Sequence, residues 1–331
     1  MPEPLLYLKA IGATAIASAT FVLAMAAVRR PASQSRLNSA CVLAMGVGLA
    51  LGYYVLSLPT TWSPKNGLDR LLTIVIPAAL TIELFVGFQR VPTWGTWLLR
   101  ISLAAAIPRI LLHDSVYLSG SDNDWTLWQF SMVLAVCGAL LVGTWCLLSC
   151  LSKRHPGVSI PLALCLTTQC AGLTVMMAGY IKGGAAAFPL ATTLLATTIT
   201  AKLIANRSGA TANFAVPAIL GIGVVGLFGL LFIGLFFGRL STYSAMTMLL
   251  APLLCCVSEA PLLKHWKPWV VGSIQLVLVA IPLMVVLFLS KRDFDRDMTP
   301  LLGHVLQSTL HVDAPPAVSF NLHWAADEDA P

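Results

Sequence analysis

Ten long apolar runs follow one another along the chain and limit its fold more than any other feature. Most of them have the length of about 17 to 25 residues that a helix needs to cross a bilayer. Only 10% of the 331 residues are charged, against about 25% in a soluble domain. The sequence therefore predicts an all-α integral membrane bundle of about ten transmembrane helices, at residues 5–28, 37–58, 71–88, 97–112, 128–151, 158–180, 184–205, 213–238, 241–262 and 269–290.

The fourth run, 97–112, looks the least regular. It is short and contains Arg100, Pro108 and Arg109, so a tilted or re-entrant segment is the alternative to a full crossing. The first run also has an alternative, because AMA at 24–26 resembles the cleavage site of a signal peptide. Two arginines follow it directly and oppose export of the next segment, which favours a retained helix.

Charged residues between the runs predict the orientation. The connections after even-numbered runs hold bases and acids together, and three acids lie in HDSVYLSGSDNDW, residues 113–125. The connections after odd-numbered runs hold no acid, and the positive-inside rule places them in the cytoplasm and both termini outside, as in a bacterial cytoplasmic (inner) membrane protein. The bases are spread too thinly to suggest a nucleic-acid partner. The bases in the connections after odd-numbered runs are Arg29, Arg30, Arg36, Arg90, Lys153, Arg154, Arg207, Lys264 and Lys267.

An internal repeat is a further prediction. NSACVLAMGVG begins at Asn38 and NFAVPAILGIG begins at Asn213, and Pro77 matches Pro252 at the same offset. Chance matching of apolar segments is the alternative. A true repeat relates helices 1–4 to helices 7–10 by an axis along the membrane normal. It divides the chain into a first four-helix repeat (1–112), an acidic outer loop (113–127), a linker pair (128–180), a second four-helix repeat (184–290) and an acidic tail (291–331).

The tail after Ser290 carries seven acids and three bases. Within it, Leu302, Val305, Leu306 and Leu310 fall roughly on one helical face, which suits an interfacial helix or a groove on a protein partner. A solvated, partly ordered tail is the alternative. The expected partners are therefore the lipid bilayer and a protein that binds the tail.

The sequence indicates neither a metal nor a cofactor. All eight cysteines lie in apolar runs without a CxxC pair, and we interpret Cys146 and Cys150, which share a helix face, as packing residues. HExxH, GxSxG and Walker A motifs do not occur. GIGVVG at 221–226 matches a dinucleotide-binding motif in its letters alone, because no strand precedes it, and we interpret it as helix packing. No characterised family is recognisable.

Two carboxylates lie within the apolar runs, Glu83 and Glu259, each six or seven residues after a proline. An ionisable group in a membrane helix is costly and suggests function, here a place on a substrate or ion pathway. The alternative is an anchor at the cytoplasmic rim, paired with Arg90 or Lys264. We expect at least one of the two to face the bundle interior.

Two further groups are candidates. Arg109, His113 and Asp114 form a polar cluster at the outer end of the fourth run, which suits an anion site, a catalytic site or a simple interfacial cap.

The seventh run offers a polar face of Thr193, Thr197 and Thr200, followed by Lys202. These hydroxyls suit a pathway or ordinary close packing of helices.

Three functions follow from these features. The first is a transporter-like protein with its site at the repeat interface, and it rests on the repeat, the paired acids and the prolines within helices. The second is a non-catalytic membrane subunit or scaffold that binds a partner through its outer loop and tail. An enzyme that uses the cluster around Arg109 comes third. A cavity near the middle of the membrane would favour the first.

Overall fold

The computed structural model describes most of the chain. It divides the chain into two units, Met1–Lys291 and Arg292–Pro331, which are described separately below. The described residues are 4–28, 34–58, 64–88, 91–113, 127–154, 157–207, 217–259 and 268–312.

Every regular element among these residues is a helix, which confirms the all-α prediction. The elements, in chain order, are α1 (Pro4–Val28), α2 (Gln34–Val55), α3 (Gly67–Arg70), the π-helix η1 (Leu71–Val75), α4 (Ile76–Phe88), α5 (Thr93–Leu112), α7 (Leu127–Arg154), α8 (Ser159–Met177), α9 (Ile181–Arg207), α10 (Pro217–Phe237), α11 (Thr242–Leu250), the 3₁₀-helix η3 (Ala251–Glu259) and α12 (Pro268–Val312).

Nine helices in the described part are long and apolar enough to cross a membrane, and the protein is an integral membrane helix bundle. The fourth expected span, α5, is a continuous helix of 20 residues that includes Pro108. Two other spans are irregular: the third, which begins with the π-helix η1, and the ninth. There α11 ends at Leu250 and gives way to η3, because Pro252 has no N–H to donate and its ring opposes a regular α-turn.

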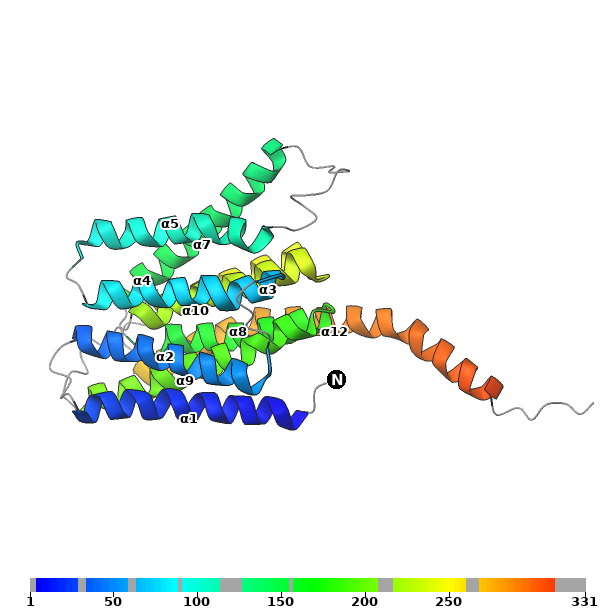
Figure 1. The fold of residues 1–331 in the computed structure, drawn as a ribbon, viewed down its shortest axis with the longest axis horizontal. Coiled ribbons are helices and arrows are strands. Elements are labelled where there is room, and N and C mark those ends of the chain that lie inside the picture. Colours follow the sequence, from blue (N-terminus) through cyan, green and yellow to red (C-terminus); the bar gives the residue numbers. More distant parts are fainter. Residues whose placement is uncertain are drawn as a thin grey trace, which may run out of the picture. The chain divides into compact units, whose positions relative to one another are not determined.

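The helices of the first unit pack around α10. The helices α1, α2, α4 and α5 run alongside one another as successive layers (Figure 1), and α10 contacts α2, α4, α7, α8 and α9. Almost every residue of α10 from Ala218 to Gly234 is buried. Its glycines permit this. A Cβ at Gly223 would lie 3.1 Å from Leu194 of α9, and Gly226 and Gly229 abut leucines in the same way. GIGVVG is therefore a packing surface.

Close hairpins hold the other helices. The helices α8 and α9 join through a turn in which Gly179 has φ +89°, a left-handed conformation that glycine adopts without strain. Gly48 and Gly52 of α2 let α1 and α9 approach. A Cβ on Gly48 would collide with the Ser18 hydroxyl, and one on Gly52 would lie 2.7 Å from Cβ of Pro189. This is the small-residue packing typical of membrane helices.

The helix α12 begins in the first unit and is attached there to η3. Gln275 is buried, and its Nε2 donates to the Cys255 carbonyl oxygen at 2.9 Å. In the second unit the helix continues to Val312. The side chains of the predicted apolar face, from Leu302 to Leu310, lie outside the described part of the structure. The internal repeat and the division into five parts remain predictions.

Candidate functional site

The two groups in the first unit that bear most directly on function are a buried ion pair and a lateral groove. The ion pair joins Glu83 of α4 to Arg100 of α5. Arg100 Nε donates to Glu83 Oε1 at 2.9 Å, and Nη2 donates to Oε2 at 2.9 Å. Glu83 is 0% exposed and Arg100 is 6% exposed. This is the bidentate geometry in which guanidinium and carboxylate bind each other most specifically.

The two residues meet because α4 and α5 are neighbours in sequence with a very short connection. Glu83 lies about 7 Å along the axis from the end of α4, and Arg100 lies about 10 Å from the start of α5, so an antiparallel hairpin brings them to similar depth. The sequence therefore indicated this pairing, because Glu83 and Arg100 lie at nearly equal distances from the connection between α4 and α5. The alternative role of Glu83, an anchor at the cytoplasmic rim, paired it with Arg90, which lies outside the described residues, and Arg100 was not considered as its partner.

Aromatic rings and a glycine complete the surroundings of this pair. The Arg100 guanidinium carbon lies 5.5 Å from the Trp97 ring centroid and 5.2 Å from that of Trp145, within the range of cation–π attraction. A Cβ on Gly221 of α10 would lie 2.6 Å from Glu83 Oε1. The helices α4, α5, α7 and α10 therefore converge on the pair, and only glycine fits at position 221 without displacing the carboxylate.

Both charges of the pair are satisfied inside the protein. Glu83 faces the bundle interior, as expected for one of the two acids, but its carboxylate is bound by an arginine and no side of it is exposed. The pair is suited to fixing α4 against α5. The side chain of Glu259 and the whole of Lys264 lie outside the described residues.

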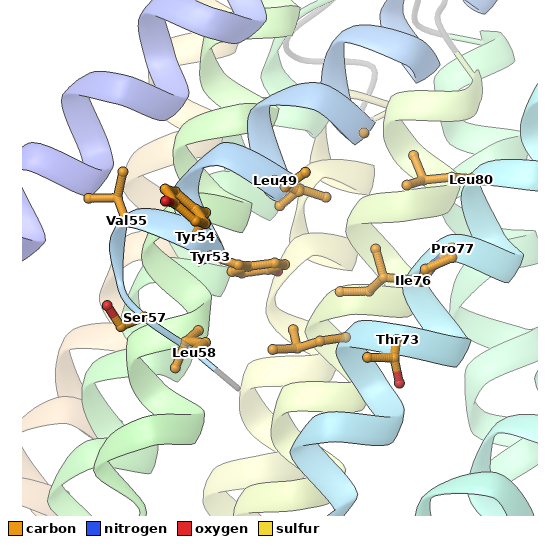
Figure 2. A pocket seen from close by; sticks show the side chains of 13 residues that line it. Leu49, Tyr53, Tyr54, Val55, Ser57, Leu58, Thr73, Ile76, Pro77 and Leu80 are labelled. Carbon is orange, nitrogen blue, oxygen red and sulfur yellow. The ribbon is translucent and has the colours of Figure 1, made fainter. Parts of the chain in front are cut away.

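The groove lies between α2 and the segment formed by η1 and α4, and we call it the α2–α4 groove. It encloses about 930 Å³. Figure 2 shows Leu49 and Tyr53 on one wall and Ile76, Pro77 and Leu80 on the other. Its lining consists of Gly46, Leu49, Ala50, Tyr53, Tyr54, Val55, Ser57, Leu58, Leu72, Thr73, Ile76, Pro77 and Leu80.

The groove is a wedge that is closed at one end. The helices are tightly packed where Ser35 Oγ donates to the Gly87 carbonyl oxygen, and a Cβ on Gly87 would lie 2.9 Å from Ser39 Oγ. About two to three turns further on, a Cβ on Gly46 would lie 3.6 Å from Cδ1 of Leu80, an ordinary contact. The groove lies beyond this point, and most of its lining residues there, such as Leu49, Tyr53 and Ile76, are bulky. Small residues at one end and bulky residues at the other thus produce the opening.

The backbone is irregular on both walls of the groove. The five residues Leu71–Val75 form a π-helix directly before Pro77, on one wall. On the other wall Ser57 has φ 50°, a left-handed conformation that is uncommon for any residue except glycine. π-Turns and unusual backbone conformations gather at functional sites in proteins. The α2–α4 groove is therefore a stronger candidate than its apolar lining alone would suggest.

A few polar groups surround the open end of the groove. Ser57, Tyr53 and Thr73 contribute hydroxyls to its lining, and Thr73 Oγ1 donates to the Asp69 carbonyl oxygen at 2.6 Å. Lys65, which precedes α3 at this end of the helices, is exposed. No charged side chain lines the groove itself.

Asp69 and Tyr180 interact electrostatically. Tyr180 lies in the turn between α8 and α9, and Asp69 is buried in α3. Burial and the Asp69 carboxylate raise the pKa of the Tyr180 hydroxyl above its ordinary value. The phenol is therefore held in its neutral form.

The predicted threonine face of α9 lies in the packing of α9 with α1 and α2. Thr193, Thr197 and Thr200 are buried, and Thr197 Oγ1 donates to the Thr193 carbonyl oxygen at 2.6 Å. The Thr193 hydroxyl faces Gly48, whose Cβ would lie 3.2 Å away. Lys202 is partly buried nearer the end of the helix. None of the four lines the α2–α4 groove.

In the predicted cluster at the end of α5, the described interaction is made by the backbone of His113. Arg109 and His113 are both exposed, and Asp114 lies outside the described residues. The His113 carbonyl oxygen accepts a hydrogen bond from Nη1 of Arg70, a buried residue of α3. Arg70 thereby caps the C-terminal end of α5, a role that we had not assigned from the sequence.

The cysteines are all free thiols. No family model matches the chain, and no curated protein and no solved structure is significantly similar to it.

Proposed function

We propose that this integral membrane protein is transporter-like and that it moves an amphipathic, largely apolar molecule bound in the α2–α4 groove. The observation that carries the proposal is the groove itself, a space of about 930 Å³ between two membrane-spanning segments. This volume is within the range of about 300 to 1,000 Å³ that is usual for small-molecule sites.

The walls of the groove support movement as well as binding. Transporters change shape where helices are broken or loosely wound. The π-helix before Pro77 replaces the regular α-helical hydrogen bonds over Leu71–Val75, and Ser57 ends α2 in a left-handed conformation. These two places can change their backbone angles at lower cost than a regular helix, so the walls can close or separate.

The groove replaces the repeat interface as the proposed site because the ion pair of Glu83 and Arg100 is sealed. A carboxylate on a substrate pathway needs access to water or to a cation, whereas Glu83 is enclosed by Arg100, Trp145 and Gly221. In this proposal the pair supports the wall that α4 forms, and the substrate does not touch it.

The experiment follows a fluorescent phospholipid in proteoliposomes. The full chain is reconstituted with a phospholipid that carries a nitrobenzoxadiazole group on one acyl chain, and dithionite is added outside to bleach every probe that reaches the outer leaflet. The wild-type protein should allow bleaching of the inner-leaflet probes. An inner leaflet that stays protected at a verified protein density refutes the transport proposal.

Two matched variants connect that activity with the groove. Ala50 lines the groove and Leu51 does not, although both lie in the same turn of α2 and are exposed. Ala50→Trp fills the space and should abolish bleaching of the inner leaflet. Leu51→Trp adds the same ring to the neighbouring position and should leave the bleaching unchanged. Equal effects of the two substitutions separate the activity from the groove.

A non-catalytic membrane subunit or scaffold is the second candidate. The observation in its favour is α12, whose apolar residues Val277, Ile281, Met284 and Phe288 are all exposed within the first unit. A partner helix could pack on them, and a protein partner could bind the tail at 291–331. In that case the inner-leaflet probes stay protected in the vesicle experiment, and removal of the tail separates the chain from its partner in native membranes.

The proposed location is a bacterial cytoplasmic membrane with both termini outside, on the evidence of the charge distribution between the helices. This orientation puts the open end of the α2–α4 groove toward the outer leaflet. Cysteine labelling at 152–157 and at 113–125 from opposite sides of the membrane tests it.

A further inference from the structure

We infer that the α2–α4 groove holds one hydrocarbon chain of a bilayer phospholipid, with the lipid head group at the end marked by Ser57 and Thr73. The inference rests on the proposed function, because it names the chemical class of the molecule that occupies the same groove.

The surroundings of the groove are the first ground. Its walls belong to the spans Ser35–Val55 and Gly67–Gly87, so it lies at the depth of the hydrocarbon layer. It is open at the side, where Tyr54 of the lining is 82% exposed and Pro77 of the opposite wall is also exposed. The medium outside these residues in a bilayer is the acyl chains of lipids. A chain can therefore enter sideways without leaving an apolar environment.

The length of the groove is the second ground. The helical part of its α2 wall, from Gly46 to Val55, rises about 14 Å at 1.5 Å per residue. The hydrocarbon core of a bilayer is about 30 Å thick, so one leaflet contributes about 15 Å. The groove is thus as deep as the layer that one acyl chain occupies. Gly46 and Leu80 are the lining residues at the end where the chain would end, and a Cβ on Gly46 would already be in van der Waals contact with Leu80.

The chemistry of the lining is the third ground. Leu49, Val55, Ile76 and Leu80 present only hydrocarbon to the groove, and no charged residue is among its lining residues. A water-soluble ion or sugar would lose its hydration there without compensation. An acyl chain loses nothing by leaving the neighbouring lipid.

The polar groups lie at the opposite end from the closed one. Ser57 offers a hydroxyl at that end of the lining, whereas the Thr73 hydroxyl already donates to the Asp69 carbonyl oxygen, and exposed Lys65 lies at the same end of the helices. A phosphate ester is an acceptor for hydroxyl donors and is attracted by an ammonium group. The groove is therefore apolar at its closed end and polar at its open end, which matches a phospholipid with its acyl chain at the closed end and its head group at the open end.

Photo-crosslinking in vesicles tests the inference. The full-length protein is reconstituted in phosphatidylcholine and phosphatidylglycerol vesicles with a phospholipid that carries a diazirine at the end of one acyl chain. After irradiation, adducts are mapped by mass spectrometry. We expect adducts near Gly46 and Leu80, and a probe with its diazirine next to the glycerol should shift them toward Ser57 and Thr73.

The control is the ordinary lipid-facing surface of the same molecules. Val277 and Ile281 of α12 are exposed and do not line the α2–α4 groove, so they report simple contact with lipid. Ala50→Trp should remove the groove adducts and keep those on α12, whereas Leu51→Trp should keep both. Ala50→Phe provides a smaller obstruction if the first variant proves unstable, and the melting temperature of each variant in detergent shows whether it is folded.

The outcomes are separable from those of the transport experiment. The inference is overturned if the groove adducts are no more abundant than those on α12. It is also overturned if neither Ala50 variant changes the groove adducts. Groove adducts in a protein that leaves the inner leaflet protected keep the inference and reject transport. Lipid movement without groove adducts rejects the inference and keeps transport.

Discussion

Separate removal of each charge in the Glu83–Arg100 pair should destabilise the protein far more than removal of both. Glu83→Gln leaves the Arg100 guanidinium buried between Trp97 and Trp145 without a counter-charge, and Arg100→Met leaves the carboxylate buried against Gly221. Loss of one partner of a buried pair costs about 3 to 5 kcal/mol, because the remaining charge is desolvated and uncompensated. Each single variant should lose about that much of the free energy of unfolding.

The double variant Glu83→Gln/Arg100→Met should behave differently. It leaves no net charge in the core, and apolar or neutral replacement of a buried pair is often neutral or stabilising. We expect its free energy of unfolding to lie within about 1 kcal/mol of the wild-type value, so that the coupling energy of the double-mutant cycle is at least about 3 kcal/mol. This coupling, rather than either single effect, measures the pair.

The assay is reversible unfolding in mixed detergent micelles, followed by circular dichroism. Arg109→Gln is the matched control, because Arg109 lies on the same helix but is exposed, and it should change the free energy by no more than about 0.5 kcal/mol. Single variants of Glu83 and Arg100 that cost less than about 1 kcal/mol, as for an exposed ion pair, would refute this account of the core. A double variant as unstable as the sum of the single ones would refute it equally.

Two further predictions concern packing and pH. Gly48→Ala should destabilise the contact of α1 with α2 by about 1 to 3 kcal/mol, because its methyl group meets the Ser18 hydroxyl, whereas Gly12→Ala, where a Cβ meets nothing within 4 Å, should be neutral or stabilising in the same unfolding experiment. Tyr180 has a raised pKa in the folded state, so stability should fall as pH rises through the ordinary tyrosine pKa of about 10, where only the unfolded state ionises. Tyr180→Phe should reduce that fall, and an equal fall in both proteins would contradict the assignment.

The sequence predicted the helices well because the bilayer imposes a strong and simple rule. Backbone groups in hydrocarbon must bond within their own helix, so the length and apolarity of a run nearly determine its structure. The prediction was weaker where local backbone geometry determines the type of helix. Pro77 and Pro252 were matched to each other, yet Pro77 follows a π-turn and begins a regular α4, whereas Pro252 lies in a 3₁₀-helix. Composition does not distinguish these outcomes, because the neighbouring helices select between them.

The candidate site was predicted less well, for a different reason. Glu83 was identified from its cost in the membrane, but its partner was sought by proximity in sequence, whereas the geometry of a hairpin pairs residues by equal distance from the turn. The α2–α4 groove gave no signal at all. It depends on where small residues such as Ser39 and Gly87 bring two helices together and where larger ones hold them apart, and that is known only once the pairing of α2 with α4 is known.

The pairing of Glu83 with Arg100 also has a consequence for the order in which the chain enters the membrane. An arginine at the centre of a solitary helix adds about 2.5 to 3.5 kcal/mol to the cost of its insertion, and Arg100 lies about a third of the way along α5. In the folded protein Arg100 is bound to the carboxylate that α4 supplies. The helix α5 is thus poorly suited to partition into lipid as an independent segment, and well suited to partition together with α4 as a neutral hairpin. We therefore expect α4 and α5 to enter the membrane together, as one unit of two helices.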